Sequence, residues 1–366
     1  MSSSWGNKLK LELYGASHAA SVGARLSGLP AGEPIDPEAL RALMRRRAPG
    51  RSALGSARRE ADEVLFLGGL RDGVTDGETL CLEIKNTDAR SRDYEALRSV
   101  PRPGHADYAA RLKYGEAADL RGGGVFSGRM TAPLCAAGGV CLQLLRRRGV
   151  GIASHLLSVG EIEDEPFDPL GPSADTLRQL RTAAWPTLSA ERGEQMREQI
   201  EKAAAEGDSL GGVAECVVTG LPAGLGGPLF EGLEGQIASL LFAIPAVKGV
   251  DFGAGFAAAR LHGSENNDPY AVRNGKISME SNHAGGILGG ISTGLPLLFR
   301  AAFKPTPSIA KAQRSVDLAT MTETELRVTG RHDPCIVPRA LPVVEAAAAL
   351  ALLDRMLEEG KWTTEN

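Results

Sequence analysis

The chain has 366 residues, 43% of them hydrophobic, and a formal net charge of −4 from 41 basic and 45 acidic side chains. A chain of this length and composition can bury a large core, as one large domain or two closely packed ones. The near balance of charge argues against nucleic acid or a membrane surface as the main partner. Any site for an anion must therefore be local.

Predicted strands and helices are interleaved along the chain. Short strands, for which antiparallel pairing is plausible, are predicted at 9–14, 63–67, 79–84 and 212–218. The first helix should begin at Asp36-Pro37, where an Asp cap precedes a proline, and further helices are predicted at 131–148, 189–205, 229–242 and 342–357. The last is apolar on nearly every side and should be buried. Segment 161–186, rich in Pro, Asp and Glu, is predicted to be a loop excursion and is the one plausible internal boundary.

The cysteines and the N-terminal segment indicate in which cellular compartment the protein is expected. The five cysteines are odd in number and lack the paired short spacing of a zinc or redox site, so we expect reduced thiols and no metal. The N-terminal residues have no apolar core like that of a signal peptide, and no apolar run approaches the ~20 residues of a spanning helix. We therefore expect a cytoplasmic protein that does not enter a membrane.

Three histidines stand in distinctive local sequences far apart in the chain. His18 lies in GASHAASVG, His105 in RPGHADY, and His332 in GRHDPC, where Asp333 follows it. Imidazoles among glycines and small or charged residues suggest one site assembled from three segments. A site shared by the beginning, middle and end of the chain favours a single domain over residues 1–366.

Basic residues are concentrated in three segments. Arg45, Arg46 and Arg47 end the first predicted helix, RGGGVFSGRMT spans 121–131, and KPTPS spans 304–308. Each has an ordinary structural explanation: cations at a helix C-terminus, a tight glycine turn, or a surface turn. Taken together with the histidine segments, they point to an anionic ligand with more than one phosphate or carboxylate.

Further motifs make the pattern more specific. NTDARSRDY, RPGHADY, KYG and RGGG are followed by DSLGGV, GLPAGLG, IPAVKGV, NHAGGILGGISTG, KPTPSI and GRHDPCIVPRALPVVEA. In order and spacing, these blocks from about Gly15 to Leu357 resemble the chorismate synthase family. The resemblance implies an α+β fold, a single-domain β-α-β sandwich with helices between antiparallel sheets, and a homotetramer.

The resemblance also implies a carbon-oxygen lyase that acts on a phosphate. The family converts 5-enolpyruvylshikimate 3-phosphate to chorismate by 1,4-anti elimination of phosphate, within the shikimate pathway to aromatic amino acids. It requires reduced FMN, which assists phosphate loss without net redox change. No Rossmann-type glycine fingerprint for NADP follows a strand here, so we expect another system to supply the reduced flavin.

Residue roles follow from the matching motifs. The catalytic residues implied are His18 as proton donor to the departing phosphate, His105 beside the flavin N1 and C2 carbonyl, and Asp333 as base. FMN would be held by Ser127, Ala246, Gly289, Lys304, Pro305, Thr306, Ser308 and Arg331. Substrate oxygens would be bound by Arg46, Arg129 and Arg339, to which Arg331 could also contribute. Asp107 could fix the tautomer of His105 or cap local backbone amides.

Several positions depart from the usual family pattern, and they cluster around the expected site. They are Ala16, Ala19, Ala53, Val125, Phe126, Met130, Leu295 and Pro307. Two interpretations follow: a working enzyme, which we favour, and a non-catalytic or repurposed paralogue that keeps an anion pocket with impaired FMN binding. A generic phosphosugar-binding protein is a third, but it leaves His105 and Asp333 unexplained.

Overall fold

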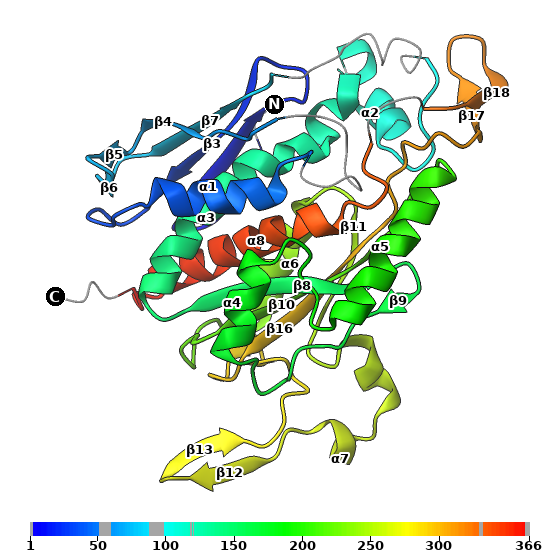
Figure 1. The fold of residues 1–366 in the computed structure, drawn as a ribbon. Helices are drawn as coiled ribbons and strands as arrows, with labels where there is room; N and C mark the ends of the chain where they lie inside the picture. Colours follow the sequence, from blue (N-terminus) through cyan, green and yellow to red (C-terminus); the bar gives the residue numbers. More distant parts are fainter. Residues whose placement is uncertain are drawn as a thin grey trace.

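Two antiparallel sheets enclose a layer of helices in this protein (Figure 1). The computed structural model describes residues 3–50, 60–87, 99–117, 119, 121–328 and 332–362. One core cluster draws side chains from both sheets and from the helices between them. The predicted α+β sandwich is thereby confirmed.

The first sheet has five strands in the order β1-β2-β3-β7-β4. They are β1 (Ser3–Trp5), β2 (Lys10–Gly15), β3 (Ser21–Ser27), β7 (Leu80–Lys85) and β4 (Leu65–Gly68). A short pair, β5 (Leu70–Arg71) and β6 (Val74–Thr75), extends from it. The strand predictions near residues 9, 63 and 79 are confirmed to within two residues at each end.

The second sheet has the order β11-β16-β10-β8-β9. Its strands are β11 (Val247–Phe252), β16 (Leu297–Phe303), β10 (Gly212–Thr219), β8 (Gly151–Val159) and β9 (Ile162–Glu163). Cys216 and Val218 of β10 face the main core, whereas Val217 faces a smaller cluster on the opposite side. This alternation means that both faces of the sheet are covered.

The helical layer contains α1 (Pro37–Arg47), α3 (Thr131–Arg147), α6 (Leu233–Ala243) and α8 (Val337–Glu358). Asp36 caps α1 by accepting hydrogen bonds from Glu38 N and Ala39 N, as predicted. Helix α8 is buried along most of its length, also as predicted, but it begins five residues early and contains Pro342. It packs on α3 and on strands β8 and β10, while α3 also contacts β3 and β7.

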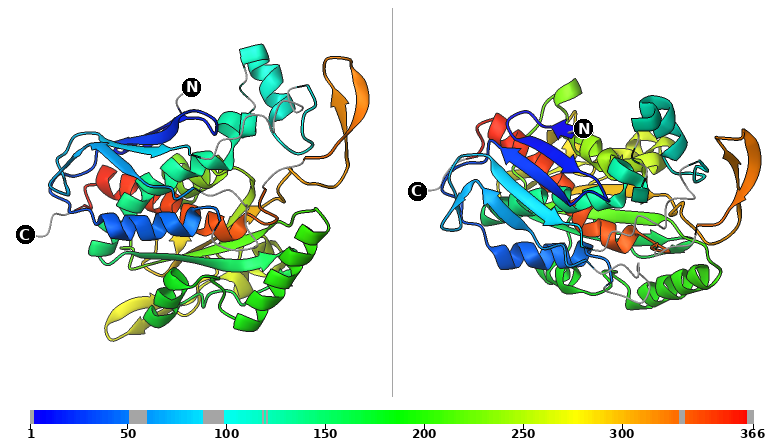
Figure 2. Two further views of the ribbon diagram at one scale, coloured as in Figure 1. Left: turned by 45° about the horizontal axis from the view of Figure 1, so that its top comes forward. Right: turned by 90° about the horizontal axis from the view of Figure 1, so that it is seen from above.

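Helices α4 (Ala174–Thr182) and α5 (Ala190–Ala205) lie on the other side of the second sheet from α8 (Figure 2). The expectation of a loop at 161–186 was wrong here, because this segment includes β9 and α4. Leu177 and Leu180 of α4 bury their side chains with Phe167 against the sheet. Leu177 and Leu180, three residues apart on one face, are the two buried side chains that anchor this short helix, and Ser173 is its N-cap.

Two hairpins project from opposite ends of the body (Figure 1). They are β12 (Tyr270–Arg273) with β13 (Lys276–Met279), next to α7 (Gly263–Asn266), and β17 (Gln313–Asp317) with β18 (Thr322–Leu326). Smaller elements are α2 (Asp107–Tyr114), β14 (Ile287–Leu288) and β15 (Ile291–Ser292). Within the described ranges, no helix is long and apolar enough to cross a membrane. All five cysteines lie in described parts of the chain and are free thiols, as expected.

A buried histidine of the second sheet forms hydrogen bonds that hold segment 161–189 against this sheet. His155 of β8 is fully buried, with Nδ1 3.3 Å from Asp164 Oδ2 and Nε2 3.0 Å from Glu215 Oε2. Asp164 also accepts hydrogen bonds from the backbone amides of Leu188 and Ser189. Burial by itself lowers the pKa of His155, but the two carboxylates outweigh it, and the pKa is raised above its ordinary value.

This arrangement makes part of the stability depend on pH. Because the folded protein holds the His155 proton more tightly, the stabilisation is complete below the unfolded pKa of about 6.5 and is lost as pH rises through the higher folded pKa. His155→Gln should therefore lower the thermal midpoint most near pH 6 and progressively less towards about pH 9. Exposed His262, changed to Gln, is the control. A His155→Gln deficit that grows with pH would contradict the charged network.

Candidate active site

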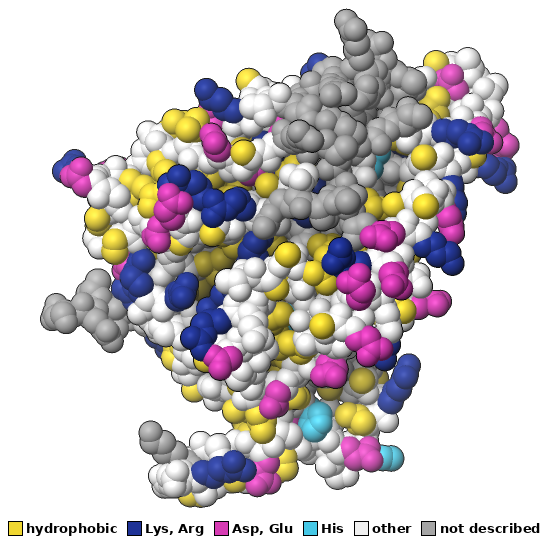
Figure 3. Space-filling view, viewed as in Figure 1, with side chains coloured by type: hydrophobic (Ala, Val, Ile, Leu, Met, Phe, Trp, Pro, Cys, Tyr) yellow, Lys and Arg dark blue, Asp and Glu magenta, His cyan; other side chains and the backbone are white. Residues whose placement is uncertain are grey.

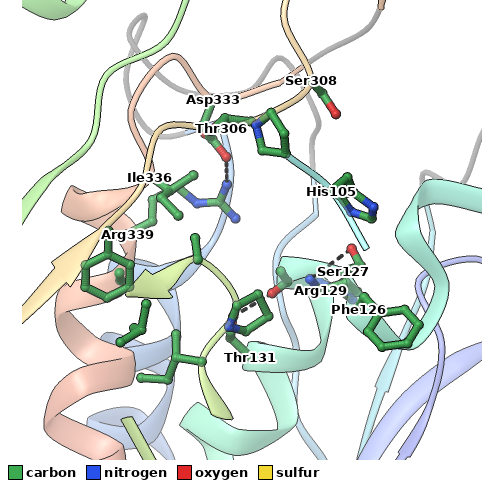
Figure 4. Close-up of a pocket in the computed structure, with 18 of the residues that line it drawn as sticks. His105, Phe126, Ser127, Arg129, Thr131, Thr306, Ser308, Asp333, Ile336 and Arg339 are labelled. Atoms are coloured by element: carbon green, nitrogen blue, oxygen red, sulfur yellow. Dashed lines mark hydrogen bonds and ion pairs between the residues drawn. The ribbon is translucent and has the colours of Figure 1, made fainter. Parts of the chain in front are cut away.

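A cavity of about 700 Å³ lies where several chain segments meet (Figure 4). Its walls come from the end of α1, the glycine run before α3, the turn between α6 and β11, the segment after β16, and the beginning of α8. This volume is within the range of about 300–1,000 Å³ that is usual for small-molecule sites. The cavity is thus the candidate active site.

Most of the predicted site residues line this cavity. They are His18, His105, Ser127, Arg129, Ala246, Lys304, Thr306, Ser308, Asp333 and Arg339. Pro305 is flanked by two of them but is not itself part of the lining. Gly289, which follows β14, and Arg46 are also outside the lining. Arg331 lies outside the described residues. His332, the third histidine with a distinctive local sequence, also lines the cavity.

The glycine run allows the side chains of His18 and His105 to lie close against its backbone. Gly122, Gly123 and Gly124 all have positive φ, at 58°, 87° and 55°. A Cβ atom on Gly122 would lie 2.2 Å from Cε1 of His18, and one on Gly123 would lie 3.1 Å from Nε2 of His105. The sequence suggested that these glycines make room for a ligand. In the structure they make room for the two imidazoles that border the cavity.

The His18 ring is oriented by its neighbour Ser17. Ser17 Oγ lies 3.1 Å from His18 Nδ1 and donates a hydrogen bond to the carbonyl oxygen of Arg121 at 3.0 Å. Since that hydroxyl proton is committed to a carbonyl, the serine oxygen can accept a hydrogen bond from a protonated Nδ1. Ser17 is fully buried, so the contact is shielded from water.

His105 is held by an arginine and a carboxylate. Its Nδ1 lies 2.6 Å from Asp107 Oδ1, and Asp107 also accepts hydrogen bonds from the backbone N and side chain of Arg102. Burial tends to raise the pKa of Asp107, but the bonds from Arg102 and His105 hold it well below its usual range. Asp107 is therefore ionised, and Nδ1 carries a proton. Both roles considered for Asp107 are realised, because it fixes the tautomer and accepts a backbone amide bond.

Asp333 and Arg339 form an ion pair across the first turn of α8, visible in Figure 4. Arg339 Nε also donates to the backbone oxygen of Arg47 at 2.9 Å, which ties α8 to the end of α1. Burial is the main cause that lowers the pKa of Arg339. The ion pair keeps Asp333 at the cavity beside the Arg339 guanidinium.

Arg46 and Arg47 have different surroundings. Arg46 forms a bidentate pair with Glu345 of α8, with N···O distances of 2.7 and 2.8 Å. Arg47 lines the cavity and reaches Asp62 and Thr131. Sequence reasoning selected Arg46 and missed both Arg47 and Asp62. The run of three arginines signalled a basic helix end, but it did not indicate which side chain faces the cavity.

The KPTPS segment supplies a cation and two hydroxyls. Lys304 and Lys248 both line the cavity, and burial followed by the charge of Lys248 lowers the pKa of Lys304. Ser308 Oγ accepts a hydrogen bond from Arg102 Nη1 at 3.2 Å. Thr306 Oγ1 is occluded and has no hydrogen-bond partner among the described residues. A buried hydroxyl in that state is suited to a ligand oxygen.

The turn before β11 is strained at the cavity wall. Ala246 has φ of +77°, and its carbonyl oxygen accepts a hydrogen bond from Lys304 N at 3.0 Å. A positive φ at alanine is unfavourable, and such strain is common at ligand sites. Apolar side chains adjoin this turn and continue along the cavity; they include Phe242, Ile244, Val247, Phe303, Ile336 and Val343.

The positions that depart from the family pattern have varied surroundings. Val125, Phe126 and Pro307 line the cavity, whereas Met130 packs against the main core. The carbonyl oxygens of Ala16 and Ala19 accept hydrogen bonds from Asn86 Nδ2 at 3.0 and 2.7 Å, so backbone contacts hold the segment around His18. Ala53 lies outside the described residues.

Comparisons with known proteins identify the family of this chain. The family model described as chorismate synthase matches residues 9–357. A chorismate synthase from Lancefieldella parvula is 45% identical, covering 100% of this chain and 98% of that protein, and one from Thermococcus gammatolerans is 46% identical over 98% of each. A crystal structure of chorismate synthase aligns with a TM-score of 0.75 and 28% identity, covering 97% of this chain and 93% of that one. This chain belongs to the chorismate synthase family, and it is a lyase.

Proposed function

We propose that this cavity catalyses the 1,4-anti elimination of phosphate from 5-enolpyruvylshikimate 3-phosphate, giving chorismate. The observation that carries the proposal is the convergence of His18, His105 and Asp333, from three distant segments, on one cavity with arginines in its wall. The cations suit a substrate with a phosphate and two carboxylates. On the face shown in Figure 3, acidic and basic side chains are interspersed.

FMN is the cofactor we propose, in its reduced form. The cavity residues fit it: an apolar wall runs along Phe303, Ile336 and Val343, and Lys304 and Lys248 offer cations for a phosphate. The occluded Thr306 hydroxyl is available to a ligand oxygen, and Ser127 and Ser308 add further polar atoms. Reduced flavin would supply electron density that helps the phosphate leave and is regained when the product forms.

The protein's own groups then have distinct tasks. His18, oriented by Ser17, would donate a proton to the departing phosphate. Asp333 would take up the proton lost from the substrate carbon, held at the cavity by Arg339. His105, with Nδ1 bonded to ionised Asp107, would present Nε2 towards the cofactor and balance its charge.

Substrate binding is assigned to Arg47, Arg129 and Arg339, all of which line the cavity. Arg47 replaces Arg46 in this proposal because Arg46 is outside the cavity lining and pairs with Glu345. Gly289 and Arg331 were expected to hold FMN. Gly289 is outside the lining of this cavity and Arg331 lies outside the described residues, so both stay predictions as FMN-binding residues.

A non-catalytic paralogue is the less favoured function. Phe126 and Val125 place apolar side chains where the family has polar ones, yet the histidines, Asp333 and the cationic wall are all retained around the cavity. An apolar side chain can pack against a flat ring as well as a polar one can bond its edge. Loss of the two polar groups therefore does not by itself remove the cofactor site.

We also propose that the protein is a homotetramer supplied with reduced flavin by a separate reductase. Large apolar side chains on the β12–β13 hairpin are exposed, with Tyr270, Val272 and Ile277 at 68%, 76% and 78%. Phe230 is 98% exposed. Such side chains on a projecting hairpin are suited to burial between copies of the chain. Light scattering coupled to size exclusion gives the assembly size directly.

One anaerobic assay tests the proposed reaction. Purified protein is incubated with photoreduced FMN and 5-enolpyruvylshikimate 3-phosphate, and chorismate and inorganic phosphate are quantified. Equal amounts of both products are expected, with none when oxidised FMN is used. A folded protein that binds FMN, seen by quenching of its fluorescence, but releases no phosphate would support the paralogue instead.

A further inference from the structure

Asp62 is a buried carboxylate that does not itself line the cavity but pairs with two arginines that do, and it lies outside every motif that identified the site. It lies in the short segment before β4, and its side chain is fully buried. Its φ is +52°, a conformation that is unfavourable for a residue with a Cβ atom. A strained backbone that places a charge in the protein interior requires strong compensating contacts, and these come from two arginines.

The Asp62 carboxylate bridges Arg47 and Arg129. Oδ2 lies 2.7 Å from Nε and 2.5 Å from Nη2 of Arg47, and Oδ1 bonds to Nη1 of Arg129. The Arg47 and Arg129 side chains are 3% and 2% exposed. Burial alone would raise the pKa of Asp62, but Arg47 and then Arg129 outweigh it and lower the pKa. The carboxylate is therefore charged between two cations that would otherwise repel each other.

The remaining contacts fix the direction of each guanidinium. Arg47 Nη1 donates to Thr131 Oγ1 at 3.0 Å. Arg129 donates from Nε to Asn86 Oδ1 at 2.7 Å and from Nη2 to the Lys85 carbonyl oxygen at 3.1 Å, while Nη1 also pairs with Glu60 at 3.2 Å. Each guanidinium has five N–H groups. Within the described parts of the chain, these contacts leave donors on both arginines, which line the cavity.

We propose that Asp62 is a positioning residue that holds Arg47 and Arg129 in register, so that their remaining N–H groups bind the anionic groups of the substrate together. The inference rests on the proposed function and adds a residue that does not itself touch substrate. The two possible roles of Asp62, neutralising the arginines or positioning them, predict opposite effects on anion binding when Asp62 is removed. If Asp62 only neutralised the arginines, its removal would strengthen anion binding; if it positions them, removal weakens binding.

Asp62→Asn separates these possibilities, because the amide keeps the size of the side chain but loses its charge and one acceptor. Calorimetric titration of the flavin-free protein with 5-enolpyruvylshikimate 3-phosphate should show affinity reduced about tenfold or more, equivalent to about 1.4 kcal/mol. In the reconstituted assay, KM should rise by a similar factor while kcat changes less than about threefold. Asp251→Asn is the matched control, since Asp251 pairs with Arg300 outside the cavity lining.

Unchanged or tighter binding by a folded Asp62→Asn protein would overturn the inference while leaving the proposed function intact. A wild-type protein that binds no substrate would instead overturn both. Should Asp62→Asn fail to fold, Thr131→Val removes the acceptor for Arg47 Nη1, together with the hydrogen bond that the hydroxyl donates to the Gly128 carbonyl oxygen. That variant should weaken binding about threefold if the orientation of Arg47 matters, and wild-type affinity would contradict the inference.

Discussion

Asp333→Asn should lower kcat by a factor of about 100 or more, in the range that a positioned general base contributes. Asparagine preserves the size of the side chain and can still accept a hydrogen bond from Arg339, but it cannot take up a proton at neutral pH. Asp333 lines the cavity and is paired with Arg339 on the first turn of α8. The measurement is the steady-state kcat for chorismate formation with reduced FMN in excess.

The substrate affinity of the Asp333→Asn variant provides a second test. In the wild-type protein the positive charge of Arg339 is shared with Asp333, and the substitution releases that charge for the substrate. The affinity for 5-enolpyruvylshikimate 3-phosphate should therefore be unchanged or higher in Asp333→Asn. Loss of binding in a folded variant would contradict the role of Asp333 as base. Asp251→Asn, which alters another Asp–Arg pair, should retain both wild-type rate and affinity.

The elements that sequence predicted well carry strong local signals. The cap at Asp36 predicted the beginning of α1, and apolar residues on nearly every side identified α8 as buried. The beginning of α8 was missed because Pro342 resembles a first-turn proline, whereas Pro338 already occupies that position. The helix α4 was missed because its stability depends on Phe167 and the sheet face, which are contacts distant from its own sequence.

The residues of the active site also fall into two groups, those that local sequence predicts and those that only the fold brings together. Motifs predicted the residues that line the cavity from His18 to Arg339, because each motif carries its own chemistry. Apart from Asp107, the buried partners could not be found from sequence. Asp62 meets Arg129 only through the fold, and nothing local distinguishes it from a surface aspartate. Successive helix residues differ by about 100° in direction, so the choice between Arg46 and Arg47 depended on how α1 packs.

The ion pair between Arg46 and Glu345 predicts the second large effect, on stability. Glu345 is 2% exposed, and besides Arg46 it accepts hydrogen bonds from Ser154 N and Oγ at 3.1 and 2.7 Å. It thereby connects α1, α8 and β8 within the interior. Burial lowers the pKa of Arg46, but the charge of Glu345 outweighs it and raises the value, so the guanidinium is charged. Removing Glu345 leaves that buried charge without a partner.

Glu345→Gln should consequently destabilise the fold by about 3–5 kcal/mol and lower the thermal midpoint by about 5 °C. Adding Arg46→Met removes the unpaired charge as well. The double variant should therefore recover most of the lost stability, because removing both partners of a buried ion pair is far less damaging than removing one.

The double variant also tests whether Arg46 binds substrate. If Arg46 is structural, substrate affinity at a temperature well below the transition should equal that of the wild type. A double variant that is stable but binds substrate about tenfold more weakly would return Arg46 to the substrate site, and would show that its pairing with Glu345 is exchanged for the ligand on binding.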